Sequence, residues 1–416
     1  MKRNRMKTIC IFICIAILCS SFLDQRMIVA TNEQIEYERN ADVLDAQNTG
    51  SESIPSPNTT ENFSDDVYYP PGTDTVYTVT DDVYYPTVTD TVYTVTDDVY
   101  SSRYLIRFTE MEQGLSTLSS LNIQTYHTYK YLPIIAVHEL SDIQLNQLTQ
   151  DPNVEYLEKD KLVFINSDFV TPSHVHLQAS NIQNEYDGTG VKVAFFDTGI
   201  DMESSELAIA NGISFVPGEP TYDDLHGHGT HVAGIVAALP GNNGLAGIAP
   251  NIDLYAVKVL NRDGMGTYSQ IIQGIEWAID HDIDIISMSF SGMEYSAALA
   301  DAIQLAHQHD ILMIASVGND GSNQKTYPSA YPHVLGIGAV DDLNELAEFS
   351  NFGQHMDLVA PGVQVLGLSL EPGQYVYRSG TSMAASYVTG VAALMLQKNP
   401  NMNVRQIEQL LFQSAD

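Results

Sequence analysis

The chain has 416 residues, 44% of them hydrophobic, so it is long enough for two or three domains and too apolar to be disordered throughout. Its 18 basic and 52 acidic residues give a net charge of -34, which argues against nucleic acid as a partner because such a surface repels phosphate backbones. The charge is compatible with an extracellular protein, with a protein that binds cations and with a protein that works in a salty medium, and the charge alone does not distinguish these three.

The first 30 residues are predicted to be a secretory signal peptide. Residues 1–7 are basic, residues 8–23 form an apolar run, and Ala30 is a small residue after which cleavage can occur. An uncleaved membrane anchor is the alternative, although the run is short for a membrane span. The cysteines of the chain all lie in this segment: Cys10, Cys14 and Cys19. We therefore expect a secreted, extracellular protein without disulfides, free or associated with the cell surface.

Residues 31–102 are predicted to be an acidic, low-complexity linker. Within them, DDVYYPPGTDTVYTVT (65–80) recurs as DDVYYPTVTDTVYTVT (81–96), and a third copy begins at 97–100. An array of stacked repeats needs at least about three copies to bury a core, so we expect an extended spacer. A tyrosine-rich segment that binds a surface is the alternative.

The pattern changes at Arg103. Between 103 and 166, alternating apolar residues and stretches with helical spacing predict the order β-α-β-β-α-β, a small α+β unit. Beyond it, short apolar runs alternate with helical stretches; the runs are 191–197, 253–260, 283–290, 311–317 and 334–340. Such runs predict an α/β domain, a parallel sheet with helices on both faces. Ligand sites of such sheets lie at the carboxyl ends of the strands.

Three side chains suited to acyl transfer stand at the ends of these elements. Asp197 closes an apolar strand, where burial of an acid is costly without a partner. His228 lies in a glycine-flanked turn before a helix, and Ser382 begins another apolar helix, whose free N–H groups favour negative charge. An Asp that orients a His, which deprotonates a Ser, is the general scheme of nucleophilic acyl transfer.

His228 has two histidines near it, His226 and His231, so a zinc site is the alternative to a catalytic base. Residues two apart cannot share one face of a helix, and the stretch has no HExxH-type pairing with a glutamate base. The pattern therefore favours a base.

From about residue 103 to the end, the chain resembles the secreted subtilisin-like serine proteases with their N-terminal propeptide. Four blocks carry the resemblance, in this order: VKVAFFDTGID, HGHGTHVAGIVAAL, IASVGNDG and SGTSMAASYVTG. The chain order Asp, His, Ser is also that of subtilisin. The resemblance implies a three-layer, mostly parallel sheet preceded by a ferredoxin-like propeptide domain. It also implies a secreted serine endopeptidase that acts through an acyl-enzyme.

The resemblance also assigns roles to individual residues. Asp197, His228 and Ser382 would be the catalytic triad, and Asn319 would donate its amide to the oxyanion. His231 would be a structural histidine behind the site. His226 is an extra histidine, for which we expect a solvated loop side chain.

The stretch SMSFSG resembles the strand along which subtilisins pair the substrate backbone, with Ser289, Phe290 and Ser291 at its centre. The family usually has glycine at the position of Ser291, so this side chain would narrow the first specificity pocket. Asp320 would lend the rim of that pocket negative charge and tolerate basic side chains.

The chemistry implied by the resemblance needs no cofactor, but a structural calcium ion is expected from it. The residues in or near the segments of the family's calcium site are Glu206, Leu239, Asn243 and Leu245. Pro240 and Gly241 depart from the usual ligand pattern, and an ordinary surface loop is the alternative.

Residues 103–166 would be the inhibitory propeptide, joined near Asn166 and Ser167 to a catalytic domain over 167–416. We expect a monomer whose partners are protein or peptide substrates and its own propeptide. Ser386 and Tyr387 replace a proline and a histidine of the family. The final strand and helix of the family have no counterpart in this chain, so a truncated catalytic domain is a hypothesis. A leader or maturation peptidase of narrow specificity, or a self-processing surface protein, would carry the same triad.

Overall fold

The computed structural model describes residues 103–166, 186–240 and 245–415, together with the backbone of three short strands: β1 (Thr78–Thr80), β2 (Val83–Tyr85) and β8 (Phe169–Thr171). The predicted signal peptide and most of the linker lie outside the described residues. β1 and β2 pair antiparallel within the repeat. No helix in the described part of the chain is long and apolar enough to cross a membrane.

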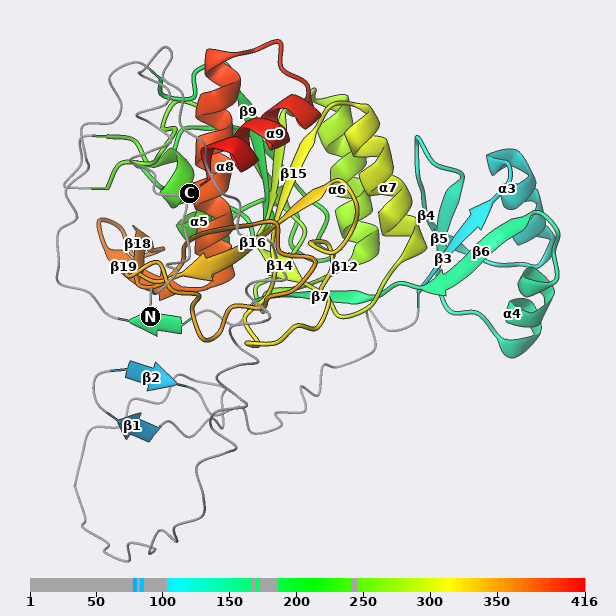
Figure 1. Ribbon diagram of the computed structural model, residues 1–416. Coiled ribbons are helices and arrows are strands. Elements are labelled where there is room, and N and C mark those ends of the chain that lie inside the picture. The colour runs from blue at the N-terminus through cyan, green and yellow to red at the C-terminus, as the bar shows by residue number, and fades with distance from the viewer. Residues whose placement is uncertain are drawn as a thin grey trace, which may run out of the picture.

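A seven-stranded sheet, parallel throughout, forms the centre of the C-terminal unit (Figure 1). Its spatial order is β10 (Ile209–Ser214), β11 (Asp253–Lys258), β9 (Lys192–Asp197), β13 (Ile285–Met288), β15 (Leu312–Ser316), β16 (Val334–Val340) and β17 (Leu358–Pro361). The five strands predicted from apolar runs are all present. The two edge strands, β10 and β17, were missed because they are partly exposed and their sequences, IANGIS and LVAP, are not continuous apolar runs.

Helices cover both faces of this sheet (Figure 1). α5 (His228–Ala237) and α8 (Thr381–Lys398) share one hydrophobic core with Val193 and Phe195 of β9, and α9 (Val404–Ser414) packs on the same side. α6 (Tyr268–Asp280) and α7 (Ala297–Gln308) share the other core with Ala194 and Phe196. Successive residues of β9 thus point to opposite faces, and the predicted three-layer α/β arrangement is confirmed.

The N-terminal unit, residues 103–166, contains a four-stranded antiparallel sheet with the strand order β4-β5-β3-β6. In chain order its elements are β3 (Tyr104–Phe108), α3 (Met111–Ser120), β4 (Thr125–Thr128), β5 (Ile134–Val137), α4 (Asp142–Thr149) and β6 (Val154–Lys159). One face of the sheet, with Ile106 and Ile135, forms a small core of its own. The other face, with Leu105 and Ile134, joins the core of α6 and α7, so this unit is packed onto those two helices.

Two carboxylates of the N-terminal unit lie at the beginnings of these helices. Glu158 accepts hydrogen bonds from the Ser296 hydroxyl at 2.6 Å and from two backbone N–H groups in the first turn of α7, at 3.1 and 3.0 Å. Asp160 accepts hydrogen bonds from the backbone N–H and hydroxyl of Ser269, at 2.9 and 2.6 Å, in the first turn of α6. A helix N-terminus has unpaired N–H groups and a positive dipole end, so each carboxylate provides acceptors for donors that lie where the unit docks, while burial raises the pKa of Asp160.

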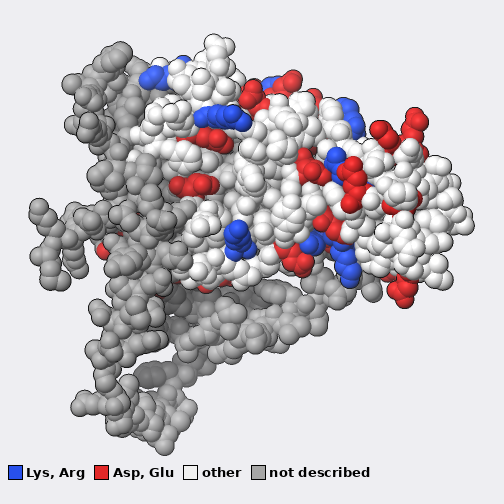
Figure 2. All heavy atoms as spheres, turned by 45° about the vertical axis from the view of Figure 1, so that its right-hand side comes forward, with Lys and Arg blue, Asp and Glu red and all other residues white. Residues whose placement is uncertain are grey.

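Two small antiparallel sheets complete the described chain. β7 (Leu162–Ile165) lies between β12 (Met265–Thr267) and β14 (Phe290–Ser291), and β19 (Tyr375–Ser379) lies between β18 (Val365–Leu368) and β8. On the face drawn in Figure 2, the coloured Lys and Arg residues occur in small groups with Asp and Glu near them. The described residues drawn there form no broad basic patch of the kind that binds a nucleic-acid backbone.

Candidate active site

β7 (Leu162–Ile165) lies as an extended strand between β12 and β14, and the space between these two strands is called the groove below. β7 pairs antiparallel with β12 on one side and with β14 on the other, and the N–H of Ile165 donates to the carbonyl oxygen of Gly264 at 2.9 Å. A Cβ atom on Gly264 would stand 2.7 Å from the Ile165 side chain, and one on Gly292 would stand 3.0 Å from the carbonyl oxygen of Leu162. Both glycines therefore allow the segment to approach closely.

The strand predicted to pair with substrate takes part in this groove. Phe290 is opposite Ile165 and Ser291 is opposite Phe164 in the register of β14 with β7. Ser289 lies between β13 and β14 and is buried. Of the three residues selected from the sequence, Phe290 and Ser291 thus pair with an extended segment of the chain, and Ser289 directly precedes them.

Asp197 and His228 form a buried pair at the carboxyl edge of the central sheet. Asp197 is the last residue of β9 and His228 is the first of α5. The Asp197 Oδ1 atom lies 2.7 Å from His228 Nδ1, and the two side chains are 2% and 0% exposed. At so short a distance the imidazole is held in one orientation, with Nδ1 toward the carboxylate and Nε2 away from it.

Ser382 lies at the same edge of the sheet, as the second residue of α8. It exchanges long hydrogen bonds with Ser289, which follows β13, the strand next to β9. Each hydroxyl donates to the other residue's carbonyl oxygen at 3.4 Å. Because Ser382 is the second residue of α8, its hydroxyl oxygen stands at the positive end of a long helix, where negative charge is favoured.

Asn319 follows β15 and meets the beginning of α8. Its amide oxygen accepts hydrogen bonds from the backbone N–H and the hydroxyl of Thr381, both at 2.9 Å. Because the oxygen is held by the residue next to Ser382, the Nδ2 group is the donor side of this amide.

Comparison with known proteins gives a consistent result. The model of the subtilase family matches residues 188–416. M-protease of Shouchella clausii (strain KSM-K16) is 39% identical over 330 residues, which cover 75% of this chain and 86% of that protein. Subtilisin E of Bacillus subtilis (strain 168) is 37% identical over 325 residues, 75% of this chain and 85% of its own.

The chain belongs to the subtilase family. It is a serine endopeptidase, and its substrates are peptides or proteins. A third relative, the thermostable alkaline protease of Halalkalibacterium halodurans, is 40% identical over 303 residues, 72% of this chain and 82% of that protein.

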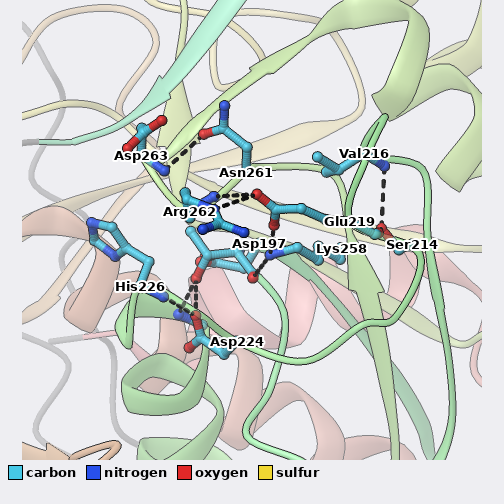
Figure 3. A network of polar contacts seen from close by, with 12 residues as sticks. Asp197, Ser214, Val216, Glu219, Asp224, His226, Lys258, Asn261, Arg262 and Asp263 are labelled. Carbon is cyan, nitrogen blue, oxygen red and sulfur yellow. Dashed lines mark hydrogen bonds and ion pairs between the residues drawn. The ribbon is translucent and has the colours of Figure 1, made fainter.

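The loop that carries His228 in this subtilase is held by Asp224. This buried carboxylate accepts hydrogen bonds from the Thr198 hydroxyl at 2.9 Å, from the backbone N–H groups of His226 and Gly227 at 2.9 Å, and from the Thr230 hydroxyl at 2.7 Å. Figure 3 shows the contact between His226 and Asp224. Burial raises the pKa of Asp224, but these donors outweigh burial and hold the pKa below its ordinary value. The sequence analysis assigned it no role, although two acids precede the histidines.

Behind Asp197, the subtilase buries an ion pair. Lys258 of β11 is opposite Asp197 in the sheet and is completely buried. Its ammonium group lies 3.0 Å from the Glu219 carboxylate and also donates to the carbonyl oxygen of Thr198 (Figure 3). Burial raises the pKa of Glu219, but hydrogen bonds from Lys258 and Arg262 outweigh it and lower the pKa below its usual value. The pair was not predicted, because Lys258 stands among the apolar residues of the predicted strand 253–260.

His226 differs from the prediction of a solvated side chain. It is half-buried, with its ring in an edge-to-face contact with His228 at a centroid distance of 6.3 Å. Burial lowers its pKa, helped by the charges of His228 and Arg378. His231 is buried, with Nε2 at 3.1 Å from the carbonyl oxygen of Val376, and burial lowers its pKa well below the usual value.

The described residues contain no group of three or more His, Cys, Asp and Glu that could hold a metal ion. Of the residues expected at a calcium site, Asn243 lies outside the described residues. The Glu206 carboxylate accepts a hydrogen bond from the Tyr375 hydroxyl at 2.9 Å, and its carbonyl oxygen accepts one from the N–H of Leu239 at 2.8 Å. These contacts bring Glu206 and Leu239 together, and the calcium site, which also includes Leu245, stays a prediction.

The ion pair behind Asp197 yields a stability prediction. Glu219→Gln leaves the buried Lys258 ammonium without a counter-charge, so we expect a loss of about 3 kcal/mol in the free energy of unfolding near pH 7. Because the pKa of Glu219 is lowered by folding, its stabilisation is present above about pH 4.3, the ordinary pKa of glutamate, and is lost as the pH falls through the lower folded pKa. Urea unfolding with a serine-protease inhibitor present, repeated from pH 7 to pH 3, measures both.

Glu203→Gln is the matched control, because Glu203 is exposed and its loss should change the free energy of unfolding by less than about 0.5 kcal/mol. Equal stability of the two variants near pH 7 would show that Glu219 contributes nothing to the support of Lys258.

Proposed function

We propose that this subtilase hydrolyses peptide bonds with Ser382 as nucleophile, His228 as general base and Asp197 as the group that orients His228. The observation that carries the proposal is the 2.7 Å contact between two buried groups, Asp197 Oδ1 and His228 Nδ1. The contact fixes the tautomer with the proton on Nδ1 and leaves Nε2 as the acceptor.

In the first half of the reaction, His228 Nε2 takes the proton from the Ser382 hydroxyl while Oγ attacks the carbonyl carbon of the scissile peptide. The imidazolium that forms is stabilised by the Asp197 carboxylate. The tetrahedral intermediate then collapses, the peptide C–N bond breaks, and His228 returns the proton to the leaving amine. Water repeats the sequence on the ester at Ser382 and releases the acid.

Negative charge on the carbonyl oxygen is stabilised by Asn319 and by the beginning of α8. The contact with Thr381 fixes the amide of Asn319, so its Nδ2 donor costs little reorganisation during the reaction.

Residues 103–166 are the inhibitory propeptide in this proposal. Their last residues fill the groove between β12 and β14, as a substrate or product would, and the rest docks on α6 and α7. The proposed cut follows Asn166 and is made by the enzyme itself. Secretion after removal of residues 1–30 completes the proposal, on the basis of the basic and apolar pattern of that segment.

Ser382→Ala removes the nucleophile, so hydrolysis should be abolished and the precursor should remain at near full length. The measurements are labelling with a fluorophosphonate, followed by peptide mapping, and the mass of the secreted product. Ser205→Ala, at an exposed serine, is the control and should be labelled and processed like the wild type. Processing of the Ser382→Ala chain at the wild-type rate would mean that another protease makes the cut.

Asn319→Leu keeps similar volume but removes the amide donor. We expect kcat to fall by about 10²–10³-fold with little change in KM, because the donor acts on charge that develops only in the transition state. Steady-state kinetics on a peptide substrate provides the test. A fall of less than about tenfold would show that the Asn319 amide does not face the oxyanion.

Glu158→Ala removes the carboxylate at the beginning of α7, so the cleaved propeptide should bind its enzyme about 30-fold more weakly, equivalent to about 2 kcal/mol. The lag between processing and full peptidase activity should shorten accordingly. Glu139→Ala is the control, since this exposed residue belongs to the same unit. An unchanged lag in Glu158→Ala would contradict the inhibitory role of this contact.

A further inference from the structure

The side chain of Asn166 is enclosed by two serines. Its Nδ2 atom donates to the hydroxyl oxygen of Ser316 at 2.6 Å, and its Oδ1 atom accepts from the hydroxyl of Ser291 at 2.6 Å. Asn166 is 5% exposed, and Ser316 is completely buried. Both ends of the carboxamide are therefore hydrogen-bonded away from water.

The side chains of residues 162–166 differ in their burial. Val163 is completely buried in the core that includes α6, whereas Phe164 is 39% exposed. The buried Asn166 is the residue before the proposed cut, so its side chain occupies the pocket next to the reacting bond. A polar side chain at this place is recognised by hydrogen bonds and not only by shape.

The two serines come from two different strands of the C-terminal unit. Ser291 belongs to β14, and Ser316 is the last residue of β15. The resemblance to subtilisins places glycine at the position of Ser291, and a glycine there would have no hydroxyl for Asn166. The contact thus depends on a residue in which this chain departs from the family pattern.

We propose that Ser291 and Ser316 form a pocket that selects asparagine immediately before the cleaved bond. The inference rests on the proposed function and names its substrate class: peptides with asparagine at this position, the chain's own Asn166–Ser167 junction included. Leucine has nearly the same shape, but it would leave the buried Ser316 hydroxyl and the half-buried Ser291 hydroxyl without this partner. Aspartate would bring a negative charge into a pocket in which the two contacts to residue 166 come from uncharged hydroxyls.

The test uses peptides with the sequence of residues 162–169, LVFINSDF, in which the asparagine is replaced in turn by Leu, Asp, Phe and Lys. For the processed wild-type enzyme, kcat/KM for the asparagine peptide should exceed that for the leucine peptide by about 100-fold, and the aspartate, phenylalanine and lysine peptides should also be cleaved more slowly. Cleavage of the leucine or phenylalanine peptide as fast as the asparagine peptide overturns the proposal. Preference for lysine also overturns it and would favour Asp320 as the determinant.

The double variant Ser291→Gly/Ser316→Ala assigns the preference to the two hydroxyls. Its asparagine-to-leucine ratio should fall below about tenfold, and Ser205→Ala should keep the wild-type ratio. An unchanged ratio in the double variant overturns the role of the serines. If that variant fails to fold, Asn166→Leu in the full chain replaces it: slower processing supports the pocket, and a wild-type rate overturns it.

The same measurements separate the inference from the proposed function. Fluorophosphonate labelling of Ser382 and cleavage without asparagine preference would overturn the inference alone. Absence of labelling and of cleavage for every peptide would overturn the proposed function, and the inference with it.

Discussion

The Asp197 carboxylate lies at the end of β9 with almost no access to water, and an ionised group in such a place is stable only if donors surround it. His228 Nδ1 and the backbone N–H of Thr198 meet its Oδ1 atom, each at 2.7 Å. The neighbouring Thr198 carbonyl is held by Lys258, and the Thr198 hydroxyl is held by Asp224. The orientation of the His228 imidazole therefore depends on a network of hydrogen bonds around the buried Asp197 carboxylate.

The sequence predicted those parts of the protein that follow from local pattern. Continuous apolar runs identified five central strands because both sides of these strands are buried, and Asp197 was found as the acid that closes one of them. Asn319 and Ser289, which follow two other strands, were assigned from the resemblance. The edge strands were missed because a half-exposed strand has no such pattern. The sequence did not reveal the roles of Asp224, Glu219 and Lys258, because their hydrogen bonds and ion pairs form between distant segments that only the fold brings together. The environment of His226 was mispredicted because exposure of a loop residue depends on its tertiary neighbours.

The departures from the family pattern have separate physical meanings. Proline at position 386 would remove a backbone donor inside α8, whereas Ser386 keeps its N–H and also donates its hydroxyl to the carbonyl oxygen of Ser382 at 3.0 Å. Ser386 thus adds a hydrogen bond beneath the proposed nucleophile. Tyr387 is accommodated next to the core of α5 and α8, where burial raises its pKa. In contrast, Ser291 adds a hydroxyl to the strand β14, where it donates a hydrogen bond to the side chain of Asn166.

The N-terminal unit and the helices α6 and α7 both contribute residues to one hydrophobic core. This shared core bears on how quickly the enzyme would become active after the proposed cleavage. Once separated, residues 103–166 would expose the sheet face that includes Leu105, Ile134 and Ala136, and would keep only a small core of their own. A fragment with so small a core would spend much of its time unfolded, and the unfolded fragment would be a substrate for enzyme molecules that the proposed cleavage had already set free. Each molecule released would hasten the release of others, so a population would switch on abruptly and would not return to its inhibited form.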